Sequence, residues 1–165
     1  CARNCVLTLI LPPEQHEMLL TALHKAGRRE VGGVLMGEHI GPNLFVVREM
    51  TVHRRGAFAS FVRRIEDAIG KIHAFFRETG HDYVRFNYIG EWHSHPSFAP
   101  YPSRTDDLSM LQIVQDVAVG ANFAVLLIAK LGPGGELIST VHTYLPDGAR
   151  SLSELRIERL DKNDR

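Results

Sequence analysis

Helical and strand-like hydrophobic patterns alternate along this chain, and this alternation constrains the fold more than any other feature. Apolar residues recur at helical spacing in three segments, and runs of strand length lie between them. The strand-like runs cover residues 6–11, 30–36, 44–50, 84–93, 122–129 and 136–145. Interleaved elements of both kinds predict the mixed α/β class, with a mixed sheet flanked by helices.

Prolines, glycines and one serine mark the ends of the predicted elements. Pro12-Pro13 opens the first helix and Gly27 closes it, a loop covers residues 53–60, and the second helix ends near Gly80. Ser103 opens the third helix, whose predicted buried stripe comprises Leu111, Val114, Val117 and Ala118. With 165 residues and no internal repeat, we expect one domain over 1–165, with an N-terminal arm at 1–5 and a polar C-terminal tail over about 146–165.

Charge, hydropathy and cysteine content narrow the function classes. The formal net charge is zero, whereas nucleic-acid binding usually relies on a basic surplus, so no nucleic-acid partner is expected. No apolar run reaches the roughly 18–20 residues that a spanning helix needs, and no signal peptide is visible, so we expect a cytoplasmic protein without a membrane partner. Cys1 and Cys5 fit neither a CxxC pair nor a zinc knuckle. The sequence carries no signal for oligomeric state.

The stretch richest in chemistry is His93-Ser94-His95-Pro96, followed after six residues by Ser103-Arg104-Thr105-Asp106. Residues two apart on a strand face the same side, so His93 and His95 can direct two imidazoles at one point. A loop with three prolines then returns the chain, and Asp106 in the first helical turn can supply a third ligand. Two histidines and one carboxylate leave one position of a tetrahedral zinc open for water, as a catalytic site requires.

Each part of this pattern has a simpler explanation on its own. A His-x-His pair on a strand is often two half-exposed side chains, and Ser103 with Asp106 resembles a helix capping pair. Nine histidines in the chain also make chance pairs plausible. The joint occurrence at this spacing, with a proline-stiffened loop between the parts, favours the metal site.

The whole pattern resembles the JAMM (MPN+) zinc metalloproteases. Their signature is an upstream Glu, then His-x-His-Pro, six residues, Ser, two residues and Asp, and this chain has every element. The segment Glu30-Val31-Gly32-Gly33-Val34-Leu35-Met36-Gly37 is similar to the E-x-C-G-x-L-x-G segment of prokaryotic members, with Gly32 where Cys is common. The resemblance spans about residues 30–117. It implies an MPN/JAB-type curved mixed sheet flanked by helices, a three-layer architecture like that of deaminases.

The resemblance implies a role for each matching residue. His93, His95 and Asp106 would bind Zn²⁺, and Glu30 would act as general base and then proton donor to the leaving amine. Ser103 would donate a hydrogen bond to the oxyanion, which is compatible with its cap. Glu91 lies in a Gly-Glu-Trp-His segment similar to that of stand-alone bacterial members. It could orient a ligand imidazole or contact substrate, or it could be an edge carboxylate in solvent, while Trp92 is predicted to be core.

The leading hypothesis from this resemblance is a metallo-isopeptidase. It would cleave after the C-terminus of a ubiquitin-like protein, as bacterial members do in antiphage conjugation systems such as CBASS, whose conjugate target is a CD-NTase-like nucleotidyltransferase. A processing peptidase for sulfur-carrier proteins would use the same site. A RadC-like protein would share only the Pro-Ser-x-x-Asp end, and a non-catalytic scaffold would lack the ligands or the Glu. A deaminase is disfavoured because the chain has no Pro-Cys-x-x-Cys motif.

Overall fold

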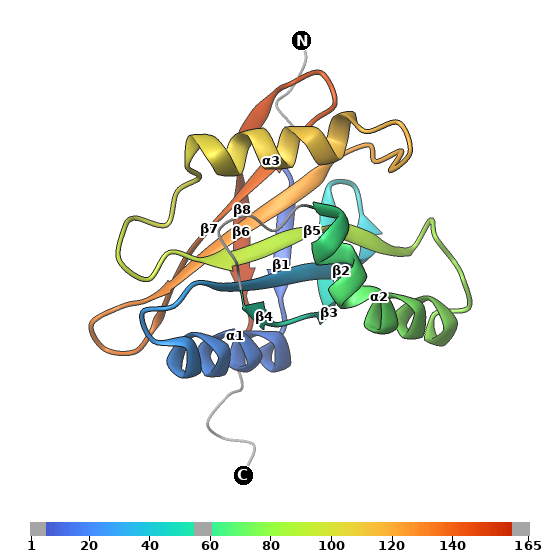
Figure 1. The fold of residues 1–165 in the computed structure, drawn as a ribbon. Coiled ribbons are helices and arrows are strands. Elements are labelled where there is room, and N and C mark those ends of the chain that lie inside the picture. Colours follow the sequence, from blue (N-terminus) through green and yellow to red (C-terminus); the bar gives the residue numbers. More distant parts are fainter. Residues whose placement is uncertain (1–5, 55–60, 160–165) are drawn as a thin grey trace.

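The computed structural model describes residues 6–54 and 61–159 and confirms the mixed α/β class (Figure 1). The predicted arm at residues 1–5 and the last residues of the predicted tail lie outside the described residues. The elements in chain order are β1 (Thr8–Leu11), α1 (Pro13–Ala26), β2 (Val31–Gly41), β3 (Leu44–Met50), β4 (His53–Arg54), α2 (Phe61–Glu78), β5 (Phe86–Ser94), α3 (Arg104–Gln115), β6 (Ala124–Leu131), β7 (Leu137–Tyr144) and β8 (Arg150–Ile157).

The curved sheet closes on itself. Its strand order is β3-β1-β8-β7-β6-β5-β2-β4, and β3 also pairs with β2. Seven strands therefore form a ring, to which β4 is attached at the start of β2. The pairs β1–β3, β1–β8 and β5–β6 are parallel, and the remaining pairs are antiparallel. The expected curved mixed sheet is thus present, but its closure into a ring goes beyond the expected layered arrangement.

Helices cover both faces of the strands that carry the candidate site. Helix α1 packs on one face against the main apolar cluster, which includes Leu35, Trp92 and Leu127. The opposite face is covered by α2 over Val34 and Met36, and by α3 over Leu126 and Ile128. Figure 1 shows α1 and α3 on opposite sides of the sheet. Among the described residues, none of the three helices combines the length and apolar content needed to cross a bilayer.

The predicted polar tail is wrong, because residues 150–157 form strand β8 between β1 and β7. This strand is buried on one face only: Leu155 and Ile157 pack on the main cluster, while Leu152, Glu154 and Arg156 on the other face are exposed. Half-buried strands of this kind carry many charges, so their pattern resembles that of a solvated segment. Its hydrogen bonds to two neighbours, and not its hydrophobicity, identify it as part of the sheet.

Two smaller predictions also need correction. Helix α3 ends at Gln115 because Asp116 adopts an extended conformation, so Val117 is 94% exposed and does not belong to a buried stripe. Met110 and Ile113 are buried beside Val114 instead. The predicted loop at 53–60 begins with the short strand β4, which pairs with β2.

Candidate active site

A β-bulge in β5 determines which face its histidines occupy. The register with β2 shifts between Leu35 and Met36, which leaves Ile89 as the extra residue of β5. The extra residue changes the phase of the strand, so Trp92 packs on the α1 side while Glu91 and His93 face the other side. Gly90 permits this geometry, because its φ is +152° and a Cβ there would lie 1.9 Å from the Val125 carbonyl oxygen.

His93 is the penultimate residue of this strand, His95 directly follows the strand, and both side chains are buried. His93 pairs with Gly32 of β2 and with Ile128 of β6, and the backbone N–H of His95 donates to the Ala129 carbonyl at 2.9 Å. Their Nε2 atoms lie 3.1 Å apart, so the two imidazoles face one point.

Asp106 reaches the same point from the first turn of α3. The helix begins with a capping box, in which the Asp106 N–H donates to Ser103 Oγ at 3.1 Å and the Ser103 N–H donates to Asp106 Oδ2 at 2.9 Å. The box holds the carboxylate in one orientation. Burial alone would raise the pKa of the Asp106 carboxyl, but hydrogen bonding and the charge of His93, together with Ser103, hold that pKa well below its usual range.

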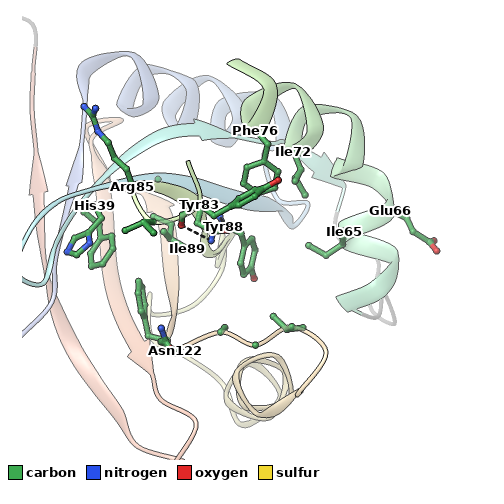
Figure 2. A pocket seen from close by; sticks show the side chains of 18 residues that line it. His39, Ile65, Glu66, Ile72, Phe76, Tyr83, Arg85, Tyr88, Ile89 and Asn122 are labelled. Carbon is green, nitrogen blue, oxygen red and sulfur yellow. Dashed lines mark hydrogen bonds between the residues drawn. The ribbon is translucent and has the colours of Figure 1, made fainter. Parts of the chain in front are cut away.

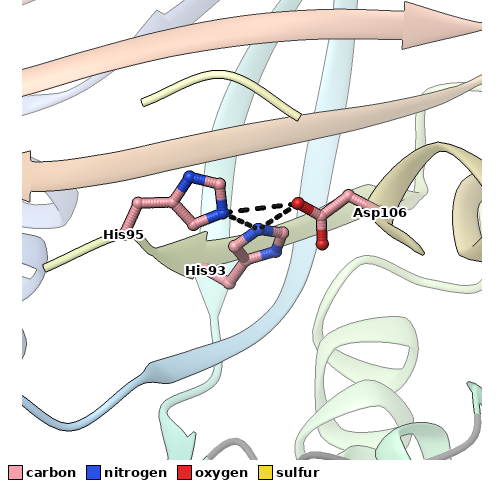
Figure 3. A group of neighbouring side chains, drawn as sticks. All are labelled: His93, His95 and Asp106. Carbon is pink, nitrogen blue, oxygen red and sulfur yellow. Dashed lines mark hydrogen bonds and ion pairs between the residues drawn. The ribbon is translucent and has the colours of Figure 1, made fainter. Parts of the chain in front are cut away.

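The three side chains form a nearly equilateral triangle of ligand atoms (Figure 3). Asp106 Oδ2 lies 3.3 Å from the Nε2 atom of each histidine, and the third edge is the 3.1 Å between the two Nε2 atoms. A tetrahedral ion with bonds of about 2.0–2.1 Å spaces its ligand atoms by about 3.3 Å. The cluster is therefore the right size and composition to hold one divalent metal ion.

The residues around the triangle orient the ligands. His95 Nδ1 lies 2.9 Å from the Ala99 carbonyl oxygen, and since a carbonyl only accepts, Nδ1 carries the proton and Nε2 presents its lone pair to the cluster. Ser94 Oγ accepts the Val31 N–H at 3.0 Å and so links β5 to the start of β2. Sequence reasoning missed both contacts; the only signal for the first was the proline-rich loop that holds Ala99.

Glu30 lies beside the cluster but is not part of the triangle. It precedes β2 and is exposed. The register pairs Gly32 with His93, and Val31 is bonded to Ser94, so continuing the register places Glu30 opposite His95. Strand alternation puts Glu30 on the same face as Gly32 and hence on the face of His93.

Gly32 allows β2 to lie close to β5 at the candidate site. A Cβ at this position would lie 2.5 Å from the Trp92 carbonyl oxygen and 3.0 Å from His93 Cβ. The absent side chain therefore lets β2 lie tightly against the strand that carries the histidines. A cysteine, which is common at this position in the similar family, would require a backbone shift here.

The other two predicted residues differ in exposure. Ser103 is exposed, and because its oxygen accepts in the capping box, its hydroxyl hydrogen can point elsewhere. Glu91 is only 6% exposed, so the interpretation as an edge carboxylate in solvent is wrong. It lies opposite Val34 on one side and Leu126 on the other. Trp92 is core as predicted, and its Nε1 donates to the Thr51 carbonyl at 2.9 Å.

An apolar pocket of about 890 Å³ lies at the other end of β5 (Figure 2). Tyr88 and Ile89 contribute to it from the strand, α2 contributes Ile72 and Phe76, and the loop after α3 contributes Phe123. None of the three residues of the triangle lines it. Tyr88 and His93 are five residues apart on the strand, so the pocket and the triangle are separated by about 16 Å.

The chain is similar to known proteins in both sequence and fold. The chain is 27% identical over 138 residues to a "CD-NTase/cGAS isopeptidase" of Enterobacter hormaechei subsp. hoffmannii (strain UCI 50), covering 81% of this chain and 73% of that protein. The fold resembles the solution structure of protein DSY2949 from Desulfitobacterium hafniense, with a TM-score of 0.64, 17% identity, and coverage of 94% of this chain and 97% of that one. The model of the family "Prokaryotic homologs of the JAB domain" matches residues 12–142, a range that includes Glu30, Glu91, His93, His95, Ser103 and Asp106, and the chain belongs to this family.

Proposed function

We propose that this protein is a zinc-dependent isopeptidase that cleaves the amide bond after the C-terminus of a ubiquitin-like protein. The proposal rests on one observation: His93, His95 and Asp106 direct two nitrogens and one carboxylate oxygen at a single buried point. Imidazole nitrogens favour zinc over calcium or magnesium, which prefer oxygen ligands. When bound, zinc lowers the pKa of a coordinated water to about 7 and polarises a carbonyl.

The residues around the triangle would handle the proton and the developing charge. Glu30 accepts a proton from the attacking water on its carboxylate and passes it to the nitrogen of the departing amine. The exposed Ser103 hydroxyl donates a hydrogen bond to the carbonyl oxygen as that atom gains charge. The capping box between Ser103 and Asp106 fixes the positions of the Ser103 hydroxyl and the Asp106 carboxylate relative to each other.

We propose that Glu91 is a positioning residue for His93 or contacts substrate. It is a buried carboxylate two residues before His93 and on the same strand face. A carboxylate beside a ligand imidazole raises its basicity and restricts its orientation.

The proposed substrate class has two supports besides the metal site. The relative from Enterobacter hormaechei is named an isopeptidase of CD-NTase/cGAS, which favours a ubiquitin-like conjugate of a CD-NTase-like protein and a role in antiviral defence. The apolar pocket beside Tyr88 lies on the strand that ends in the metal ligands. An extended tail of about five residues would span the 16 Å between them, at about 3.3 Å per residue.

Metal analysis and a cleavage assay test the proposal together. We expect about one zinc per chain and cleavage of a ubiquitin-like fusion that a chelator abolishes. Glu30→Gln should retain zinc but lower kcat by at least about 100-fold, whereas His95→Ala should lose both zinc and cleavage. His73→Ala, which changes an exposed histidine of α2, is the matched control and should behave as wild type. Wild-type cleavage by Glu30→Gln would refute the mechanism.

A further inference from the structure

The loop between His95 and Ser103 is held through three successive backbone carbonyl groups. We call residues 96–102 the proline-rich loop, because Pro96, Pro100 and Pro102 lie in it and each lacks a backbone N–H. Each of the three carbonyls accepts a hydrogen bond from a side chain: Phe98 from Lys130 Nζ of β6 at 3.2 Å, Ala99 from His95 Nδ1 at 2.9 Å, and Pro100 from Thr140 Oγ1 of β7. Side chains from the sheet therefore supply hydrogen-bond donors, of which a loop with three prolines has few.

Thr140 and His142 form one directional chain of hydrogen bonds that ends on the proline-rich loop. Thr140 Oγ1 also lies 3.0 Å from His142 Nε2. A carbonyl only accepts, so the single hydroxyl hydrogen of Thr140 is used on Pro100, and Thr140 Oγ1 must accept from His142 Nε2–H. Burial lowers the pKa of His142, as does the charge of Arg150, so the ring is neutral at pH 7 and carries its one hydrogen on Nε2.

Both side chains lie on the face of the sheet that carries the triangle. Thr140 pairs with Ile128, and Ile128 pairs with His93. Paired residues of adjacent strands share a face, so Thr140 and His142, two residues further on, lie on the face of His93. Strands are about 4.8 Å apart, which separates β7 from β5 by roughly 10 Å. The pair can therefore act on the triangle through the loop, whose Tyr101 ring also packs edge-on against buried His142.

The proline-rich loop transmits this restraint to His95 through adjacent peptide groups. Pro100 follows Ala99 directly, and because its ring fixes φ, only the ψ angle of Pro100 can change the relative orientation of the two carbonyls. The Ala99 carbonyl is the acceptor of His95 Nδ1–H. Loss of the Pro100 anchor would thus let the Ala99 carbonyl move away from the ring. The bond from Lys130 to Phe98 is a weaker anchor, because it is exposed and water competes for it.

We propose that Thr140 and His142 are positioning residues for His95. Their hydrogen bonds hold the proline-rich loop where the Ala99 carbonyl fixes the tautomer and the orientation of that ring, with Nε2 free to bind a metal ion. This inference rests on the proposed function and assigns to it two residues outside the triangle. If the two bonds served stability alone, their loss would lower Tm and leave the His95 ring unchanged.

Nuclear magnetic resonance of the metal-free full chain with ¹⁵N-labelled histidine tests the proposal without requiring cleavage. The ring ¹⁵N shifts report which nitrogen carries the hydrogen, and we expect the Nδ1–H form of His95 in wild type. Thr140→Val keeps the shape but can neither donate nor accept, so His95 should become a mixture of both tautomers. Zinc affinity should fall at least about tenfold. An unchanged His95 tautomer together with wild-type zinc affinity in Thr140→Val would overturn the proposal.

Two further variants show whether the hydrogen bonds themselves are responsible. Thr140→Ser keeps the hydroxyl and should hold zinc affinity within about threefold of wild type, with His95 in the Nδ1–H form. His142→Leu removes the donor to Thr140 and should change both measurements in the same direction as Thr140→Val. Failure of Thr140→Ser to preserve them, in a variant with wild-type Tm, would contradict a role for the hydroxyl.

A matched control on the same strand separates positioning from general loosening of the sheet. Thr143 Oγ1 lies 2.6 Å from Ser153 Oγ of β8, away from the proline-rich loop. Thr143→Val should lower Tm but leave the His95 tautomer unchanged and zinc affinity within about twofold of wild type; an effect as large as that of Thr140→Val would overturn the proposal. If wild type bound no zinc and cut no ubiquitin-like fusion, the proposed function would fail, while the ring ¹⁵N shifts of the metal-free variants would still decide the positioning role.

Discussion

Asp107→Ala is expected to destabilise the protein more than removal of either of the groups that bind this carboxylate. Asp107 follows Asp106 on α3 and joins the helix to two strands of the ring. The Tyr144 hydroxyl of β7 donates to Asp107 Oδ1 at 2.6 Å, and Arg150 Nη1 of β8 donates to both carboxylate oxygens at 2.7 and 2.8 Å. Burial and this hydrogen bond raise the pKa of Tyr144, so its hydroxyl stays protonated and donates.

The expected magnitude follows from what each change leaves behind. Tyr144 is fully buried, so Asp107→Ala leaves its hydroxyl without this acceptor at a cost of about 1–3 kcal/mol. The Arg150 side chain is 43% exposed, so solvent screening limits the lost ion pair to about 0.5 kcal/mol. The total is about 1.5–3.5 kcal/mol. Tyr144→Phe removes the hydroxyl together with its need for a partner and should cost about 1 kcal/mol.

Thermal and chemical unfolding of the single and double variants would measure these values. For a chain of this length we expect Asp107→Ala to lower Tm by roughly 5–10 °C and Tyr144→Phe by about 2–4 °C. In the double variant the two costs should not add, since no hydroxyl is left unpaired. Zinc affinity should fall about tenfold in Asp107→Ala, because the helix turn that carries Asp106 is held less firmly. Additive costs, or equal costs for the two single variants, would refute the reasoning.

Two further predictions concern the sheet around the site. Gly32→Ala should lower zinc affinity at least tenfold and also lower Tm, because its Cβ would lie 2.5 Å from the Trp92 carbonyl oxygen; wild-type metal binding would show that β2 can shift freely. Burial raises the pKa of the Glu38 carboxyl, but hydrogen bonds and charges from Arg85 and Arg48 lower it further, to below the ordinary value of 4.5. Glu38→Gln should therefore cost about 1 kcal/mol at pH 7, and urea unfolding should show this difference shrinking as the pH falls below about 4.5; a difference that grows in acid would contradict the ion pairs.

The grouping of His93, His95 and Asp106 was predictable because it depends on local rules. Two residues apart on a strand share a face, and a serine three residues before an aspartate caps a helix, so His93, His95 and Asp106 follow from sequence periods. Which face the histidines occupy was not predictable. It depends on the bulge beside Gly90, where the extra residue Ile89 reverses the alternation of faces. A single glycine in a strand does not predict such a bulge.

The parts of the fold that were missed depend on distant partners. Strand β8 is buried on one face only, with Leu155 and Ile157 facing the main cluster and charged residues on the other face, so its sequence is compatible with a solvated tail until β1 and β7 are known to flank it. The end of α3 depends on the backbone of Asp116, although Val117 and Ala118 continue the apolar pattern. Glu91 could not be assigned a burial from sequence, because its environment comes from β2 and β6 on either side.

Closure of the ring also affects when the site can form as the chain folds. Thr8 of β1 pairs with Glu154 of β8, so the pairing that completes this side of the sheet joins residues nearly the whole described length apart. Contacts of such high sequence separation form slowly, because the entropy of loop closure must be lost first. Until β8 has been synthesised and has paired, Arg150 cannot reach Asp107 and the first turn of α3 lacks its support. An unfinished chain would therefore lack a fully supported cluster of His93, His95 and Asp106, and any activity that depends on this cluster would begin only after β8 has paired.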